Sequence, residues 1–132
     1  MNRIKLSIAI PTLNRAQYLQ FTLKHFIPQI KPVKEFAELL IVNNKSDDNT
    51  TEVVKEFIMK YDFIRFYDCT DRVTLGEQFK RTVAFSKGKY VILWGDDDLP
   101  ALFLVSYLLS EIENCNNCGL FYFNRLVGYE NG

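Results

Sequence analysis

Short apolar runs along the chain alternate with segments in which apolar residues recur every three or four positions. Five runs, at residues 4–10, 39–42, 63–67, 90–94 and 119–127, predict strands. The intervening periodic segments predict helices, whose inward faces would hold Leu19, Leu23, Phe26, Ile27 and Ile30, then Val53, Val54, Phe57, Ile58 and Tyr61, then Leu75, Phe79 and Val83, and finally apolar positions of 102–112. Because the second and fourth runs are apolar throughout, both faces of the sheet should be covered. The pattern therefore predicts an α/β fold with a mostly parallel, Rossmann-like sheet and helices on both faces.

Local signals suggest where the helices begin and end. Asn14, with Gln17 three residues later, is expected to cap the first helix. Pro28 should disturb the end of that helix. Gly88 is expected just after the third helix, at the usual glycine position. Pro100 should open the fourth helix in its first turn.

Composition narrows the class of protein. With 132 residues, 48% hydrophobic and 24% charged, the chain suits one globular domain and is neither mainly disordered nor a disulfide framework. Its 16 basic and 16 acidic residues sum to zero, which does not favour a nucleic-acid partner. The first 34 residues nevertheless hold six Lys or Arg and no acid. Two interpretations remain open: a solvated surface with chance clustering, or cations that face a phosphate.

The sequence shows neither a secretory signal nor a transmembrane segment. The apolar stretch at 99–110 is shorter than the roughly 20 residues that span a bilayer. An odd number of cysteines favours a reducing compartment. A cytoplasmic location is therefore expected, peripheral to the inner membrane face in a longer protein. Cys115 and Cys118 have the spacing of a metal knuckle, but only Cys69 and His25 could complete a zinc site, so a structural role is favoured.

Unusual polar residues follow three of the predicted strands, at 11–15, 43–48 and 96–98. In parallel sheets these ends meet at one edge, where ligands bind. Three consecutive carboxylates repel one another unless a cation lies between them. Mg²⁺ or Mn²⁺ accepts one or two carboxylates and completes its shell with phosphate oxygens and water. The alternative to a metal site is that the three aspartates form an acidic loop at the start of a helix, where negative charge is favourable.

Four ordered segments carry a resemblance to a known family. They are LSIAIPTLNR at 6–15, LIVNNKSDDNT at 40–50, the residues Leu75-Gly76 and Arg81 followed by KGKY at 87–90, and VILWGDDD at 91–98. The sequence resembles the N-terminal, nucleotide-sugar-binding part of the GT-A glycosyltransferases of family 2. That resemblance implies the GT-A nucleotide-diphospho-sugar transferase fold, as a single domain over residues 1–132 that is incomplete at its C-terminus and lacks the acceptor-binding part.

The resemblance also implies particular site residues. Those implied for the nucleotide sugar are Pro11, Thr12, Asn14, Arg15, Asn43, Asp48, Arg81 and Asp96. Asp97 and Asp98 are implied as ligands of Mn²⁺ or Mg²⁺. Asn43 stands where the family usually has Asp, and Thr82 where it usually has Asn. The Asp-x-Asp signature can be framed as Asp96 with Asp98, or as Gly95 with Asp97. Both framings stay open; Asp97 or Asp98 is favoured as the metal ligand, with Asp96 near the ribose.

By resemblance, the protein is an inverting, metal-dependent glycosyltransferase of polysaccharide biosynthesis. The donor would be a nucleoside diphosphate sugar, with UDP favoured, and the acceptor a glycan or lipid-linked sugar. An inverting transfer needs a general base, and Glu130, in a Gly- and Asn-rich tail, is the sole acid after the fifth strand and a poor candidate for it. This chain alone is therefore expected to be inactive. The alternative is a non-catalytic nucleotide-sugar-binding module or inactive fragment. A receiver-like signalling domain is disfavoured, because an acid pair does not follow the first strand. A homodimer through an apolar surface at 120–129 is a secondary expectation.

Overall fold

The computed structural model describes residues 3–121 of the chain. Its sheet has four parallel strands in the order β3-β2-β1-β4. The strands are β1 (Leu6–Thr12), β2 (Ala37–Asn43), β3 (Ile64–Asp68) and β4 (Tyr90–Leu93). The helices are α1 (Ala16–Ile30), the 3₁₀ helix η1 (Lys31–Val33), α2 (Thr50–Ile58), α3 (Leu75–Phe85) and α4 (Leu104–Asn114). The predicted α/β fold with a parallel sheet is confirmed.

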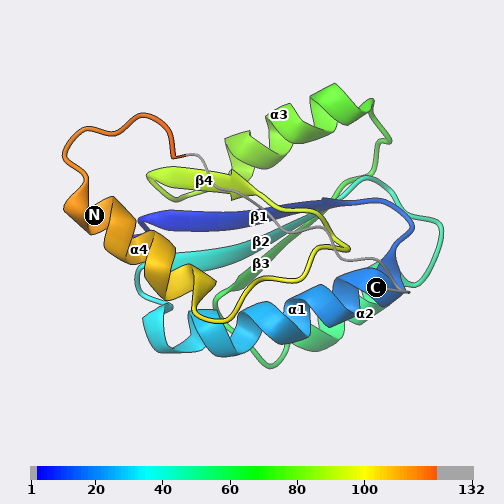
Figure 1. Ribbon diagram of the computed structural model, residues 1–132. Coiled ribbons are helices and arrows are strands. Elements are labelled where there is room, and N and C mark those ends of the chain that lie inside the picture. Colours follow the sequence, from blue (N-terminus) through cyan, green and yellow to red (C-terminus); the bar gives the residue numbers. More distant parts are fainter. Residues whose placement is uncertain (1–2, 122–132) are drawn as a thin grey trace, which may run out of the picture.

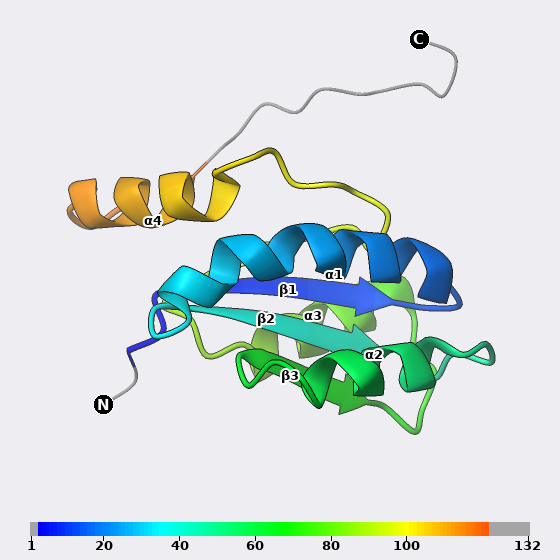
Figure 2. The ribbon, with the colours of Figure 1, turned by 90° about the horizontal axis from the view of Figure 1, so that it is seen from below.

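The sheet lies between two layers of helices. Helices α1, α2 and α4 cover one face and α3 covers the other (Figures 1 and 2). The larger core lies under the first layer, where alternate residues of β1 and β2 meet the apolar stripe of α1, and its fully buried members include Ile8, Ile10, Leu39, Ile41, Leu19, Leu23 and Phe26. The α3 side buries a smaller cluster of Ala9, Leu40 and Val42. Burial on both faces explains why β2 is apolar at nearly every position.

The first four predicted strands exist, with ends that differ by at most two residues from the prediction. The fifth, at 119–127, falls mostly outside the described residues, and 119–121 are not in a strand. The apolar surface expected at 120–129 also lies largely outside them, although Leu120 is exposed.

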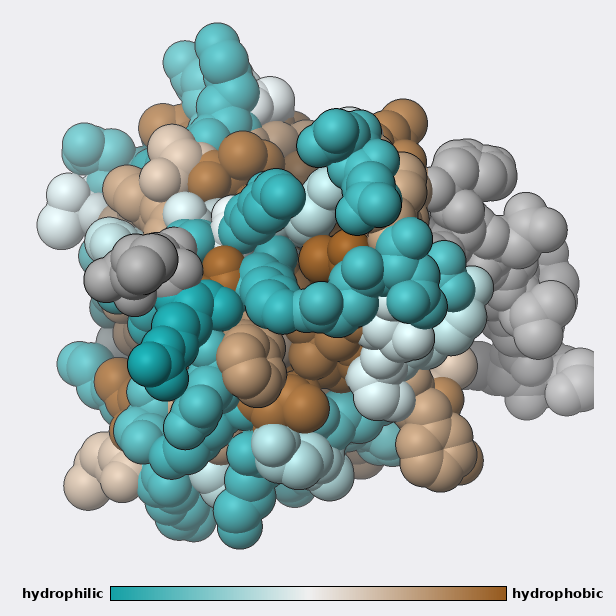
Figure 3. All heavy atoms as spheres, turned by 90° about the vertical axis from the view of Figure 1, so that its left-hand side faces the viewer, coloured by the Kyte–Doolittle hydropathy of each residue, from teal (hydrophilic) through white to brown (hydrophobic). Residues whose placement is uncertain are grey.

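At the end of the molecule where the strands begin, hydrophilic residues dominate the surface and hydrophobic ones lie between them (Figure 3).

The start and end of α1 differ from the prediction. Asn14 does not cap the helix: its φ is 54°, and its side-chain oxygen accepts a hydrogen bond from the Asp47 amide at 2.6 Å. Arg15 is the N-cap residue without a side-chain cap, and Asp48 instead accepts from the Ala16 amide at 3.2 Å. The helix also continues through Pro28 to Ile30, because the turn beyond the proline remains buried in the core.

Helix α3 is turned the opposite way from the prediction. Leu75, Phe79 and Val83 point outward, with 68%, 39% and 46% of their surface exposed. Gln78 and Thr82 are buried instead. The side-chain amide of Gln78 donates to the backbone oxygen of Val42 at 2.8 Å, so the buried polar side chain has a hydrogen-bond partner at the end of β2.

Two further boundary predictions were wrong. Gly88 is expected at the position directly after the C-cap of α3, but the C-cap is Ser86, so Gly88 lies one residue further on, and its φ is not positive. A Cβ at Gly88 would lie 2.5 Å from the Ser7 nitrogen, so the glycine allows close approach to β1. Pro100 does not open α4, which begins at Leu104. The preceding loop is held along α1 by Gln29, whose side chain donates to the Ala101 oxygen at 3.0 Å and accepts from the Val105 amide at 3.1 Å.

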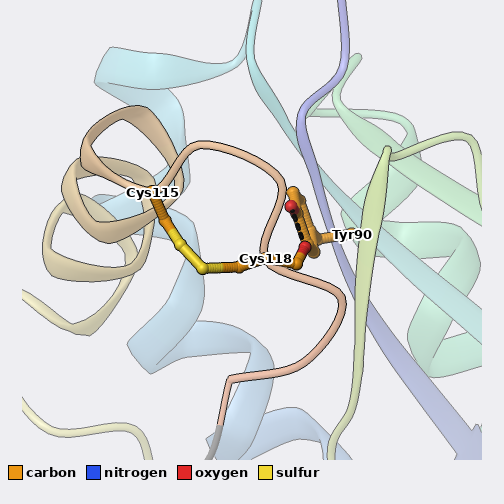
Figure 4. Close-up of a disulfide and its surroundings, with 3 residues drawn as sticks. All are labelled: Tyr90, Cys115 and Cys118. Atoms are coloured by element: carbon orange, nitrogen blue, oxygen red, sulfur yellow. Dashed lines mark hydrogen bonds between the residues drawn. A yellow bond between two sulfur atoms is a disulfide. The ribbon is translucent and has the colours of Figure 1, made fainter.

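Two of the cysteines are paired. Cys115 and Cys118 form a disulfide after α4, and the Cys118 carbonyl accepts a hydrogen bond from the Tyr90 hydroxyl of β4 (Figure 4). Cys69 is the remaining cysteine and is free. Within residues 3–121, no group of three or more His, Cys, Asp or Glu could hold a metal ion. In the same part of the chain, every helix is too short or too polar to cross a membrane.

Candidate functional site

The loops that follow β1, β2 and β4 meet at the carboxyl edge of the sheet. Thr12, the last residue of β1, donates to the Asp96 carboxylate at 2.8 Å. Arg15 donates to the Asp97 carboxylate at 2.7 Å. The Asn14 amide donates to the Ser46 hydroxyl at 2.8 Å. The three polar segments that the sequence places after separate strands therefore form one site.

This site is a cleft of about 430 Å³. Its lining residues come from these loops, from α3 and from the segment before α3: Pro11, Thr12, Leu13, Arg15, Asn44, Val73, Leu75, Gln78, Phe79, Leu93, Trp94, Gly95, Asp96 and Asp97. Apolar and aromatic walls with a few polar groups are typical of small-molecule sites. Leu75 and Phe79, which point away from the core, form part of the apolar wall of this cleft.

Asp96 is the buried member of the acidic triple. It is 9% exposed, and the Thr22 hydroxyl of α1 holds its backbone oxygen at 2.8 Å. Burial raises the pKa of Asp96, whereas the Thr12 hydrogen bond and the charge of Arg15 act to lower it. Two elements therefore hold Asp96, β1 through its side chain and α1 through its backbone, and the residue lines the cleft.

Asp97 and Asp98 gather around Gly95. A Cβ on Gly95 would collide with the Asp98 carboxylate and lie 3.4 Å from Oδ1 of Asp97. The Trp94 indole donates to the Asp98 backbone oxygen at 2.6 Å, which fixes the turn. Two carboxylates suit a Mg²⁺ or Mn²⁺ ion whose remaining ligands are phosphate oxygens and water. The residues present fit a metal shared with a diphosphate rather than one enclosed by protein alone.

The structure separates the two neighbouring asparagines after β2. Asn43 is fully buried and lies outside the cleft lining, and its side-chain amide donates to the Asp68 carboxylate at 2.8 Å. Asn44 lines the cleft, a residue that the sequence did not single out. Its side-chain oxygen accepts from Arg81 at 2.7 Å and from the Val73 amide at 2.9 Å. Successive residues of a strand point to opposite faces, which is the signal that could have distinguished them.

Arg81 and Asp48 surround the cleft without lining it. The Arg81 guanidinium also donates to Gln78 at 2.6 Å, so it braces two lining residues. Asp48 accepts from the Thr50 amide at 3.0 Å as well as from Ala16, and thereby joins the beginnings of α1 and α2. Burial acts to raise the pKa of Asp48, but hydrogen bonds from Thr50 and Ala16 hold it below its ordinary value.

Of the candidate site residues, Pro11, Thr12, Arg15, Asp96 and Asp97 line the cleft. The others among the described residues, namely Asn14, Asn43, Asp48, Arg81 and Asp98, lie next to it and hold its loops or backbone through the contacts given above. Glu130 lies outside the described residues.

The family model and the curated relatives that match this chain are all glycosyltransferases. The model of the protein family described as "Glycosyl transferase family 2" matches residues 7–131. The probable glycosyltransferase YdaM of Bacillus subtilis is 30% identical over 119 residues, which cover 87% of this chain and 28% of the relative. A cholesterol galactosyltransferase of Borreliella burgdorferi is 26% identical over 125 residues, which cover 92% of this chain and 34% of the relative. The chain thus spans about a third or less of the length of these relatives.

Solved structures share the fold. S. aureus TarS 1-349 in complex with UDP-GlcNAc matches with a TM-score of 0.75 and 19% identity over 90% of this chain and 37% of that one. The mannosyltransferase PcManGT from Pyrobaculum calidifontis, in complex with GDP-Man and Mn²⁺, matches with a TM-score of 0.66 and 22% identity. That match covers 75% of this chain and 29% of the mannosyltransferase. At these identities the matches establish the GT-A type of fold.

Proposed function

Because the chain belongs to glycosyl transferase family 2, we propose that the cleft binds the nucleoside diphosphate part of a sugar donor. The observation that carries this proposal is the meeting of Thr12, Arg15 and the acidic triple beside apolar walls. A basic and an acidic group at one cleft mouth suit a diphosphate and its cation, and the walls suit a base and a sugar.

Each part of the cleft has a role in this proposal. Asp96, fixed by Thr12, accepts hydrogen bonds from the ribose. Asp97 and Asp98 would hold Mn²⁺ or Mg²⁺, which acts as a Lewis acid that offsets the charge of the leaving diphosphate. Arg15 adds a positive charge at the cleft mouth, and Arg81 keeps Asn44 in place. We propose UDP as the nucleotide; the TarS complex holds UDP-GlcNAc, and the PcManGT complex holds GDP-Man with Mn²⁺.

The proposed reaction of the whole protein is transfer with inversion to a glycan or lipid-linked acceptor. An acceptor hydroxyl attacks the anomeric carbon, the bond to the diphosphate breaks, and a general base takes the hydroxyl proton. Within residues 3–121, the carboxylates that line the cleft are Asp96 and Asp97, which already have roles toward the donor. The base is therefore proposed to lie elsewhere in the protein, and residues 3–121 supply donor binding.

Calorimetric titration of the purified chain with UDP, GDP and UMP tests the proposal. With Mn²⁺ present, both diphosphates should bind more tightly than UMP, because the second phosphate meets the cation and Arg15. UDP binding more tightly than GDP would support the choice of base. Failure of every diphosphate to bind at millimolar concentration, in protein that circular dichroism shows to be folded, would contradict the proposed site.

A further inference from the structure

Arg15 occupies the same carboxylate that is proposed to hold the metal. Its Nη1 atom lies 2.7 Å from Oδ2 of Asp97, and the two side chains are 48% and 45% exposed. The guanidinium also lies 5.8 Å from the ring centre of Tyr18, one turn further along α1. Both Arg15 and Asp97 line the cleft. The Arg15 guanidinium therefore already lies beside the Asp97 carboxylate that a divalent cation would have to reach.

We propose that Arg15 and the divalent cation compete for Asp97, so that the cation displaces the guanidinium and leaves it available for the diphosphate. This inference rests on the proposed function of the cleft. Two positive groups at one carboxylate repel each other, and the arginine is the displaceable one because exposed ion pairs contribute little stability. A guanidinium released at the cleft mouth matches the geometry of phosphate oxygens.

The backbone near Arg15 restricts where the side chain can go. Asn14 has a φ of 54° and is tied to the loop after β2 by bonds to Ser46 and Asp47. Arg15 itself is the N-cap of α1. Its Cα is therefore fixed, and the long side chain exchanges partners by rotating within the cleft mouth. Arg15 is accordingly a binding residue for the diphosphate and a competitor of the cation for Asp97.

Competition predicts effects of opposite sign from one substitution. Arg15→Gln should bind Mn²⁺ alone about two- to fivefold more tightly, the range set by loss of an exposed ion pair. The same variant should bind UDP in saturating Mn²⁺ about tenfold more weakly, because a charge-assisted bond to phosphate is lost. An arginine that merely supported the loop would weaken both.

Mn²⁺ affinity is measured by electron paramagnetic resonance of the free ion, and UDP affinity by calorimetry. Lys34→Gln is the matched control, since it removes one positive charge from an exposed pair with Asp62 at 2.8 Å, away from the cleft lining. It should leave both affinities unchanged. In an Asp97→Asn background, Arg15→Gln should no longer improve Mn²⁺ binding, because the contested carboxylate is gone.

Three outcomes separate this inference from the proposed function. The opposite shifts, absent from Lys34→Gln and abolished by Asp97→Asn, support the competition. Unchanged or weaker Mn²⁺ binding by Arg15→Gln, with Asp97→Asn still lowering Mn²⁺ affinity, overturns the competition and leaves the proposed metal site intact. Mn²⁺ binding that survives replacement of both Asp97 and Asp98 by Asn overturns the metal site and the competition together.

Discussion

Replacement of Glu38 should reveal how the sheet is tied to the segment between α3 and β4. Glu38 lies in β2 and is 3% exposed. One carboxylate oxygen accepts from the Ser7 hydroxyl at 2.6 Å and from the Lys87 amide at 2.8 Å, and the other accepts from Arg65 at 2.7 Å. Ser7 in turn accepts from the Gly88 amide at 2.8 Å. One buried carboxylate therefore connects β1, β2 and β3 to the loop that precedes β4.

The size of the effect follows from what the substitution leaves unpaired. Removing one partner of a buried ion pair costs about 3–5 kcal/mol. Arg65 would keep its bonds to the Phe85 oxygen at 3.0 Å and the Tyr67 hydroxyl at 3.1 Å, and its side chain is 22% exposed, so water can reach it. Glu38→Ala should therefore cost about 3 kcal/mol, at the lower end of that range. Glu38→Gln keeps an acceptor for Ser7 and Lys87 and should cost about 1–2 kcal/mol.

Urea unfolding followed by circular dichroism measures these losses. Glu35→Ala is the control, because Glu35 is exposed and near in sequence, and it should change stability by less than about 0.5 kcal/mol. Combining Glu38→Gln with Arg65→Met should cost less than the sum of the two single changes, since each alone leaves its partner unpaired. A loss of under about 1 kcal/mol for Glu38→Ala, with an unchanged slope, would refute the reasoning about the buried carboxylate.

Three further predictions concern stability. Asp96→Asn should raise the free energy of unfolding near neutral pH, because burial raises the pKa of Asp96 and the native state binds this proton more tightly than the unfolded chain does. Wild-type stability should accordingly fall as pH rises from the ordinary Asp range through the raised folded pKa, and urea titrations at several pH values should show that the variant lacks this fall. Gly88→Ala should cost about 1–3 kcal/mol, because its Cβ meets the backbone of Ser7; a thermal midpoint equal to wild type would contradict the close approach. Val83→Ser should cost less than about 0.5 kcal/mol in the same assay, whereas a loss typical of a core position would show that α3 buries its apolar stripe.

The sequence predicts the sheet well because the strands of a parallel sheet that is buried on both faces are short apolar runs, which are easy to recognise in the sequence. Strand β2 is apolar from Leu39 to Val42, with the buried Glu38 before this run and a polar segment that begins at Asn43. The order of strands and loops then follows from right-handed crossovers, which bring the segments after β1, β2 and β4 to one edge. That is why Thr12, Arg15 and Asp97 could be assigned to one site before their contacts were known.

Other features depend on contacts that a one-dimensional pattern does not contain. The apolar spacing of α3 indicates a helix, but the face that turns inward carries Gln78, whose side chain donates to the Val42 carbonyl, and this contact exists only in the folded chain. Similarly, Asn43 and Asn44 are adjacent in sequence, and the register of β2 decides which of them reaches the cleft. Asp48 caps α1 across 32 positions, a pairing that follows only from the folded arrangement.

The metal dependence of UDP binding tests the central claim most directly. UDP affinity is measured by calorimetry in Mn²⁺ and in chelator, for the wild-type chain and for a variant with Asp97→Asn and Asp98→Asn. The account predicts that Mn²⁺ tightens UDP binding to the wild type by at least about tenfold, because the cation offsets the repulsion between the carboxylates and the phosphates. The variant should fold normally and bind UDP equally in both conditions. Equal affinity of the wild type in Mn²⁺ and in chelator would contradict the account.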